Sequence, residues 1–187
     1  MEGDHTVLVI AAVGNSGSGK TTTLEYLVSN LASEGYRIGA VKHIVHKGLK
    51  LDKEGTNTWR YVKVGSKVIA AVSTEEIVVI KKAETELTDL EQVLRLLGND
   101  PLDIVVVEGF RSIIEKRKDV LKIVTVKDED TLKNVLECTA QPIIAVTGLF
   151  GKQKPEIGLE IPVINIPDEG EQLLRLVREH LKPKEKS

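Results

Sequence analysis

Long apolar runs alternate with amphipathic stretches along this chain. The first run, at residues 6–13, is rich in β-branched side chains and ends at Gly14, which is typical of a strand buried on both faces. Residues 21–32 follow with apolar side chains at helical spacing, and Gly35 stands where such a helix would end. The same criteria predict further strands at residues 37–43, 68–72, 77–80, 104–107, 121–126, 143–146 and 163–166, and further helices at residues 56–64, 88–97, 130–138 and 168–181. This alternation predicts an α/β fold with a doubly wound, mostly parallel sheet flanked by helices.

The length of the chain indicates one domain. A chain of 187 residues suits a single core, so we expect one domain over residues 1–182 and a solvated tail at 183–187. Within this domain, the helix at 88–97 should begin with Thr88 as its N-cap, and Glu91 should complete a capping box.

Composition narrows the class of protein. Lys and Arg number 26 against 28 Asp and Glu, and the net charge of −2 argues against a bulk nucleic-acid binder. Cys138 is the only cysteine, which fits a reducing compartment, and we expect it to pack on its helix as a small hydrophobic residue. No apolar run approaches the ~18 residues that a bilayer-spanning helix needs, and residues 1–5 lack the basic region of a signal peptide. We therefore expect a cytoplasmic protein with no membrane or nucleic-acid partner.

The segment between the first strand and the first helix matches the phosphate-binding pattern G-x-x-x-x-G-K-[ST]. Its residues are Gly14, Asn15, Ser16, Gly17, Ser18, Gly19, Lys20 and Thr21. Glycines let the backbone curl so that successive N–H groups point at phosphate oxygens, and the helix that follows adds the positive end of its dipole. Lys20 should reach the β- and γ-phosphates, and the Thr21 hydroxyl should bind Mg²⁺. The pattern in this context predicts a P-loop NTPase fold and a bound nucleoside triphosphate.

A P-loop also needs an acidic residue for Mg²⁺, at the carboxyl end of a neighbouring strand. Glu108 ends the strand at 104–107, and Gly109 lets the chain turn away there. We predict that Glu108 joins Thr21 in the Mg²⁺ site, and the alternative is a surface glutamate. Asp103, at the other end of this strand, should be a cap or a surface charge.

The segment after the second strand carries further candidates. Lys42 could neutralise a phosphate, and we group it with Lys20 as a catalytic candidate. Asp52 could be a second ligand of Mg²⁺ or of its water shell. Ordinary loop charges account for Lys42 and Asp52 equally well, so both interpretations stay open. His43 and His46 lack the additional Cys or His residues of a transition-metal site, so we expect them to form hydrogen bonds.

Several of these segments occur in a distinctive order. The order is GNSGSGKTT, VKHIVH, the loop Asp52-x-x-Gly55-Thr56-x-Thr58-x-Arg60, Gly65 and VVVEGF. Together they resemble the molybdopterin-guanine dinucleotide biosynthesis protein B family, the GTP-binding adaptor of molybdenum cofactor maturation. The resemblance covers residues 7–122. It implies that Gly17 to Thr22 bind the phosphates of GTP, and that Asp52 and Glu108 belong to the Mg²⁺ site.

The resemblance also implies partners. Members of the family form homodimers, work with the guanylyltransferase that attaches GMP to molybdopterin, and show weak GTPase activity at most. Two departures stand out, because Gly55-Thr56-Asn57-Thr58 replaces the usual Gly-Lys-Asp-Ser type of sequence and Arg111 stands where lysine is usual. No Asn-Lys-x-Asp guanine-reading motif is present, so the preference for guanine rests on the resemblance.

Other functions use the same scaffold. An ATP-dependent ligase of the dethiobiotin synthetase kind also has a P-loop, a lysine after the second strand and a strand-end glutamate. A small-molecule kinase would need cations over the migrating phosphoryl group, for which Arg111 and Arg117 are candidates. The residues alone do not choose between GTP and ATP.

Overall fold

The chain divides into two compact units. The computed structural model describes residues 7–44, 52–82, 87–98, 100–153 and 158–182. The larger unit combines residues 1–43 with 89–187, and the smaller unit is residues 44–88. This boundary falls inside the domain expected over residues 1–182, which stays a prediction, and the expected tail at 183–187 lies outside the described residues.

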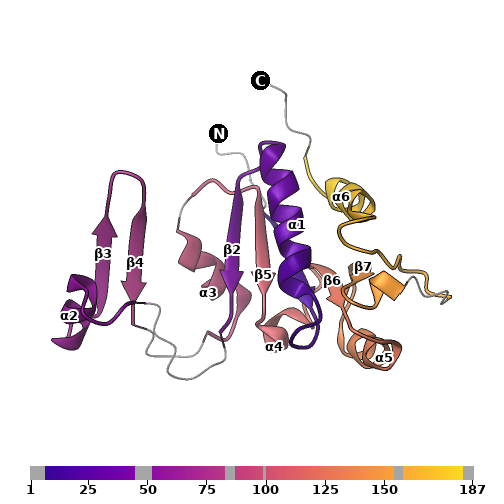
Figure 1. Ribbon diagram of the computed structural model, residues 1–187, viewed down its shortest axis with the longest axis horizontal. Helices are drawn as coiled ribbons and strands as arrows, with labels where there is room; N and C mark the ends of the chain where they lie inside the picture. The colour runs from indigo at the N-terminus through magenta and orange to yellow at the C-terminus, as the bar shows by residue number, and fades with distance from the viewer. Residues whose placement is uncertain (1–6, 45–51, 83–86, 99, 154–157, 183–187) are drawn as a thin grey trace. The chain divides into compact units, whose positions relative to one another are not determined.

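The larger unit contains a five-stranded sheet whose paired strands all run parallel, in the order β2-β5-β1-β6-β7. Figure 1 labels β2, β5, β6 and β7 of this sheet. The strands are β1 (Leu8–Val13), β2 (Ile38–Lys42), β5 (Ile104–Glu108), β6 (Leu121–Thr125) and β7 (Ile143–Thr147). Parallel strands bring their carboxyl ends to one edge of a sheet. The segments that follow β1, β2, β5, β6 and β7 therefore share that edge.

One face of this sheet packs against α1 (Lys20–Ser33) and α6 (Gly170–Arg178). From the sheet, Ile10, Ile104 and Ile123 enter this core and are fully buried. Leu27 and Leu31 of α1 meet them, also fully buried. The i, i+4 spacing of these two leucines places both on the helix face that meets the sheet.

The other face of the sheet is apolar as well. Side chains alternate along a strand, so Val9 and Val105 point away from the first core, and both are buried. The helices α3 (Leu90–Leu94), α4 (Arg111–Ile114) and α5 (Glu129–Cys138) bury Leu90, Val93, Ile114, Leu132 and Val135, all outside the first core. Burial on both faces explains why these strands read as continuous apolar runs. The predicted doubly wound, mostly parallel sheet flanked by helices is confirmed.

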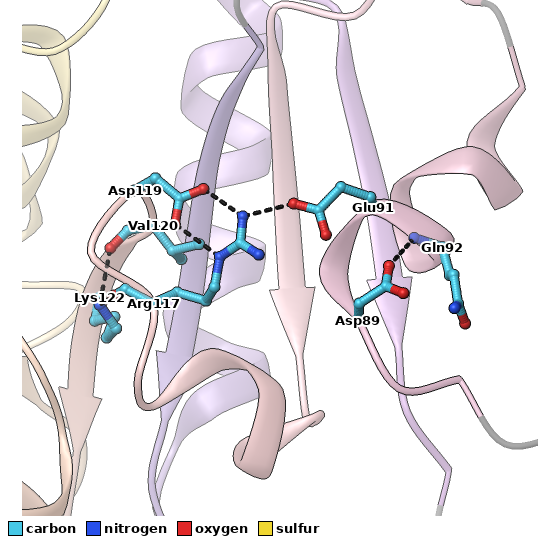
Figure 2. A network of polar contacts seen from close by, with 7 residues as sticks. All are labelled: Asp89, Glu91, Gln92, Arg117, Asp119, Val120 and Lys122. Carbon is cyan, nitrogen blue, oxygen red and sulfur yellow. Dashed lines mark hydrogen bonds and ion pairs between the residues drawn. The ribbon is translucent and has the colours of Figure 1, made fainter.

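A polar network ties α3 to the turn before β6 (Figure 2). Arg117 donates to Asp119 and, at 2.7 Å, to Glu91 of α3. Lys122, fully buried on β6, donates to the backbone carbonyl oxygens of Arg117 and Val120. Burial lowers the pKa of Lys122, and the nearby charge of Asp119 opposes that shift. Arg117, a candidate cation for a kinase, is thus held in a structural ion network.

The capping prediction for α3 was wrong by one residue. The N-cap is Asp89, not Thr88, and its carboxylate accepts a hydrogen bond from the backbone of Gln92 at 2.7 Å. Aspartate and threonine both suit the N-cap position, and the later of the two residues, Asp89, occupies it. Glu91 therefore lies too early in the helix to complete a box, and it pairs with Arg117 instead.

Two predictions near the carboxyl-terminal half also need correction. Cys138 is exposed, because Thr139 takes the inward position after Val135 and donates its hydroxyl hydrogen to the Val135 carbonyl oxygen. The strand expected at 163–166 is reduced to one bridge, in which Val163 lies opposite Val146.

The described part of the smaller unit contains a helix and a hairpin. Its elements are α2 (Asn57–Lys63), β3 (Val68–Val72) and β4 (Ile77–Lys81), and the two strands pair antiparallel as a sheet of their own. Thr56 caps α2 by accepting from the backbone of Trp59. Across both units, no helix within the described residues is long and apolar enough to cross a bilayer.

Replacing Leu27 with alanine tests the core between α1 and the sheet. Leu27 is fully buried, so Leu27→Ala should lower the free energy of unfolding by about 2–5 kcal/mol and the melting temperature by roughly 5–15 °C. Leu96→Ala is the control, because 58% of Leu96 is exposed and its truncation should change stability by less than ~0.5 kcal/mol. Equal effects of the two substitutions in a thermal melt would contradict this packing.

Candidate phosphate-binding site

The loop between β1 and α1 is held in a tight curl. Gly17 and Gly19 have φ angles of 69° and 106°, in the region that glycine adopts without strain. At Gly14 a β-carbon would lie 2.0 Å from the backbone oxygen of Thr125, so only glycine fits there. The glycines of the motif therefore serve both the curl and the close approach of β6.

Contacts with β6 and with the residue that follows β7 support this loop. The buried Ser18 hydroxyl lies 2.7 Å from the Thr125 hydroxyl and donates to the Asn15 carbonyl oxygen at 2.9 Å. Gly148, just after β7, packs so closely that a β-carbon there would lie 2.2 Å from the Ser18 carbonyl oxygen. The shape of the loop is thus set by contacts within the protein.

The residues of the loop differ in their access to solvent. Ser18 is buried, Gly14, Gly19 and Lys20 are partly exposed, and five residues of the predicted set are exposed. These five are Asn15, Ser16, Gly17, Thr21 and Thr22. The loop can therefore be reached by a ligand from outside.

Lys20 lies across the loop. Its ammonium donates to the carbonyl oxygens of Gly14 at 3.0 Å and Asn15 at 2.6 Å. Burial lowers the pKa of Lys20, Glu108 opposes this shift, and Lys42, Arg111 and Lys127 reinforce it. The loop is therefore surrounded by positive charge that a bound anion would offset.

Glu108 joins the loop to the neighbouring strands. It accepts a hydrogen bond from the Thr21 hydroxyl at 2.9 Å, and its other oxygen lies 3.2 Å from the Lys42 ammonium. The register explains this, because Glu108 lies opposite Ala12 of β1 and Lys42 of β2. The structure therefore brings together Lys20, Thr21, Lys42 and Glu108 of the predicted site.

The Thr21 and Glu108 oxygens fit Mg²⁺. The ion prefers hard oxygen ligands and usually takes only one or two from the protein, with the rest from phosphate and water. No group of three or more His, Cys, Asp or Glu residues suited to a metal occurs in the described part of the chain. A Mg²⁺ ion held by Thr21 and Glu108 would take its remaining ligands from phosphate and water.

The turn after β5 is shaped by His43. Its ring stacks on Phe110 with 4.5 Å between centroids, and its backbone N–H donates to the Glu108 carbonyl oxygen at 2.8 Å. A β-carbon on Gly109 would lie 2.6 Å from that of His43, so the turn needs glycine there. His43 thus supports the backbone that carries Glu108, and His46 lies outside the described residues.

Asp52 is a residue of the smaller unit. One of its carboxylate oxygens accepts from the hydroxyls of Thr56 at 3.1 Å and Thr58 at 2.9 Å. The other is buried and accepts no hydrogen bond from the residues that the structure describes. A buried carboxylate oxygen of this kind suits a water molecule or a hydrated cation. Its part in the Mg²⁺ site stays a prediction.

Two further cations lie near the loop. Arg111 donates to the Asn15 side-chain oxygen at 3.4 Å and pairs with Glu115. Lys127 lies against Gly17, where a β-carbon would come within 3.3 Å of its ammonium nitrogen. From the sequence, Arg111 was considered as a cation for a kinase and as a departure from the family pattern, and Lys127 was missed. The signal that could have identified both residues is their position after β5 and β6, the two strands that pair with β1.

Comparison with known proteins identifies relatives of this chain. Residues 9–148 match the family model described as molybdopterin guanine dinucleotide synthesis protein B. The molybdopterin-guanine dinucleotide biosynthesis adapter protein of Escherichia coli is 30% identical over 129 residues, which cover 68% of this chain and 70% of that protein. A putative adapter protein of the same name from Methanocaldococcus jannaschii is 33% identical over 122 residues. That match covers 65% of this chain but only 48% of the archaeal protein, so the chain spans about half of its length.

Solved structures show the same fold. A MobB protein homolog from Bacillus stearothermophilus is 26% identical with a TM-score of 0.65, over 91% of this chain and 96% of that one. Bacillus subtilis MobB gives a TM-score of 0.72 at 23% identity, over 95% of this chain and 99% of that one, and supports the fold alone. The predicted resemblance is confirmed by the family model and by the E. coli relative. The chain belongs to the molybdopterin guanine dinucleotide synthesis protein B family.

Proposed function

We propose that this chain is a GTP-binding adapter that assists the attachment of GMP to molybdopterin in molybdenum cofactor biosynthesis. Family membership and the adapter names of its relatives support the place in molybdopterin-guanine dinucleotide biosynthesis. The observation that carries the nucleotide part is the braced loop with Lys20, Thr21 and Glu108 at its mouth. A loop whose conformation is already fixed by the protein loses little conformational entropy when a phosphate binds.

Each residue at the mouth has a role in this proposal. The backbone N–H groups of the loop and the start of α1 bind the phosphate oxygens. The Lys20 ammonium exchanges its two loop carbonyl partners for the β- and γ-phosphates. Thr21 and Glu108 would hold Mg²⁺, which when bound would supply positive charge next to the terminal phosphates.

The same contacts favour slow hydrolysis. Glu108 is engaged on both oxygens, by Thr21 and by Lys42, so it is poorly placed to accept a proton from an attacking water. Lys42 offers a second positive charge to the terminal phosphate. We therefore propose nucleotide binding as the main activity and weak GTPase activity at most.

The partners in this proposal follow from the family. They are molybdopterin or the molybdenum cofactor, the guanylyltransferase that attaches GMP, and a second copy of this chain in a homodimer. The preference for guanine over adenine also follows from the family. An ATP-dependent ligase or kinase would use the same loop, so the choice of nucleotide is the sharpest test.

Thermal unfolding with different nucleotides tests the choice. With Mg²⁺ and GTP at a hundred times the dissociation constant, ligand binding should add ~2.7 kcal/mol, which raises the melting temperature by roughly 5–10 °C. GDP should also shift the melt, whereas ATP at the same concentration should not. A shift with ATP and none with GTP would overturn the guanine assignment and favour the ligase or kinase.

Substitutions at the mouth of the loop test the residue roles. Lys20→Ala should weaken GTP binding by tenfold or more, because it removes a charge-assisted hydrogen bond worth about 1.5–3 kcal/mol. Glu108→Gln should reduce the gain in affinity that Mg²⁺ provides and leave binding without Mg²⁺ largely unchanged, as measured by calorimetry with and without the ion. Lys133→Ala, an exposed lysine on α5, is the matched control. Full binding by Lys20→Ala would refute the site.

A further inference from the structure

The chain leaves β6 beside the phosphate loop, on the side away from Glu108. β1 pairs with β5 on one side and with β6 on the other, and Val13 lies opposite Val124. Glu108 ends β5, whereas Lys127 follows β6. Two charged residues of opposite sign therefore approach the loop from its two flanks.

The Lys127 side chain lies against the tip of the loop. A β-carbon on Gly17 would come within 3.3 Å of the Lys127 ammonium nitrogen and 3.6 Å of its ε-carbon. Gly17 is exposed and carries no side chain, so the ammonium lies at a surface that a ligand can reach. A larger residue at Gly17 would crowd the lysine.

The backbone on both sides of Lys127 is fixed. Before it, Val126 donates to the Thr147 carbonyl oxygen at 3.2 Å and accepts from the Phe150 N–H at 3.1 Å. After it, Asp128 caps α5 by accepting from the Thr131 N–H at 2.8 Å and the Thr131 hydroxyl at 2.6 Å. The position of Lys127 is therefore defined before a ligand arrives, which reduces the entropy lost on binding.

Charge around the loop also favours an anion near Lys127. Lys127, Lys42 and Arg111 all lower the pKa of Lys20, and Glu108 raises it. Glu108 is itself engaged by Thr21 and Lys42 on its own flank. These like charges repel one another, and a bound phosphate chain would reduce that repulsion.

We propose that Lys127 is a nucleotide-binding residue that contacts the phosphate chain on the side nearer the nucleoside. The inference rests on the proposed function, which places nucleotide in this loop. If Mg²⁺ binds with the terminal phosphates, its candidate ligands Thr21 and Glu108 would hold it on the β5 flank. The β6 flank, where Lys127 lies, then faces the phosphates that a nucleoside diphosphate and a nucleoside triphosphate have in common.

Calorimetric titration of the full chain with GTP and with GDP tests this role. Lys127→Met should weaken the binding of both nucleotides by the same factor, about tenfold, because both lose one charge-assisted contact. It should also make the affinity less sensitive to salt, since one ion contact is gone. Lys127→Arg should keep most of the affinity. Lys133→Met removes the same charge one turn into α5, where it pairs with Glu129, and should bind as the wild type does.

The outcomes separate three explanations. If Lys127→Met binds both nucleotides as tightly as the wild type, or loses affinity for GTP alone, the inference is overturned while the proposed function stands. If Lys127→Met without nucleotide melts several degrees below the wild type, Lys127 braces the loop and the nucleotide role is also overturned. If the wild type itself binds neither nucleotide, the proposed function and the inference both fail.

Discussion

The parallel pairing of β1 between β5 and β6 is the constraint on which the rest of this structure depends. It places three strand ends at one edge, so the phosphate loop, Glu108 and Lys127 become neighbours although they are far apart in the sequence. The pairing of β2 with β5 adds Lys42 to the same edge. Burial of apolar side chains on both sheet faces stabilises the inner strands β1, β5 and β6.

The candidate site is preorganised by packing. Close backbone approaches at Gly14 and Gly148, together with the Ser18–Thr125 hydroxyl pair, hold the loop open to solvent and closed towards the core. Such a site loses little conformational entropy when an anion binds. The stacked rings of His43 and Phe110 likewise hold the turn that carries Glu108 in place.

Much of the sheet and one part of the site could be predicted from the sequence. Strands buried on both faces leave continuous apolar runs, and the phosphate loop has a strict pattern, so β1, β5 and the loop were recognised directly. The strand order could not be predicted, because parallel pairing leaves no local signal, and so Lys127 was missed. The strands β3 and β4 were predicted, but their antiparallel pairing as a separate sheet was not. The outward turn of Cys138 and the start of α3 at Leu90 depend on single competing neighbours, Thr139 and Asp89, which periodicity cannot rank.

The smaller unit is inserted in the sequence between β2 and α3, and this has a consequence during synthesis on the ribosome. β1 and β2 emerge first, but they do not pair with each other, and the strand that joins them, β5, lies beyond the insertion. Two apolar strands must therefore wait without sheet partners while residues 44–88 are made. The hairpin of β3 and β4 needs only local contacts and can form during that interval. The nascent chain can therefore form its smaller unit before β5 and β6 are available to brace the loop after β1, and until then β1 and β2 lack the sheet partners that cover them in the folded protein.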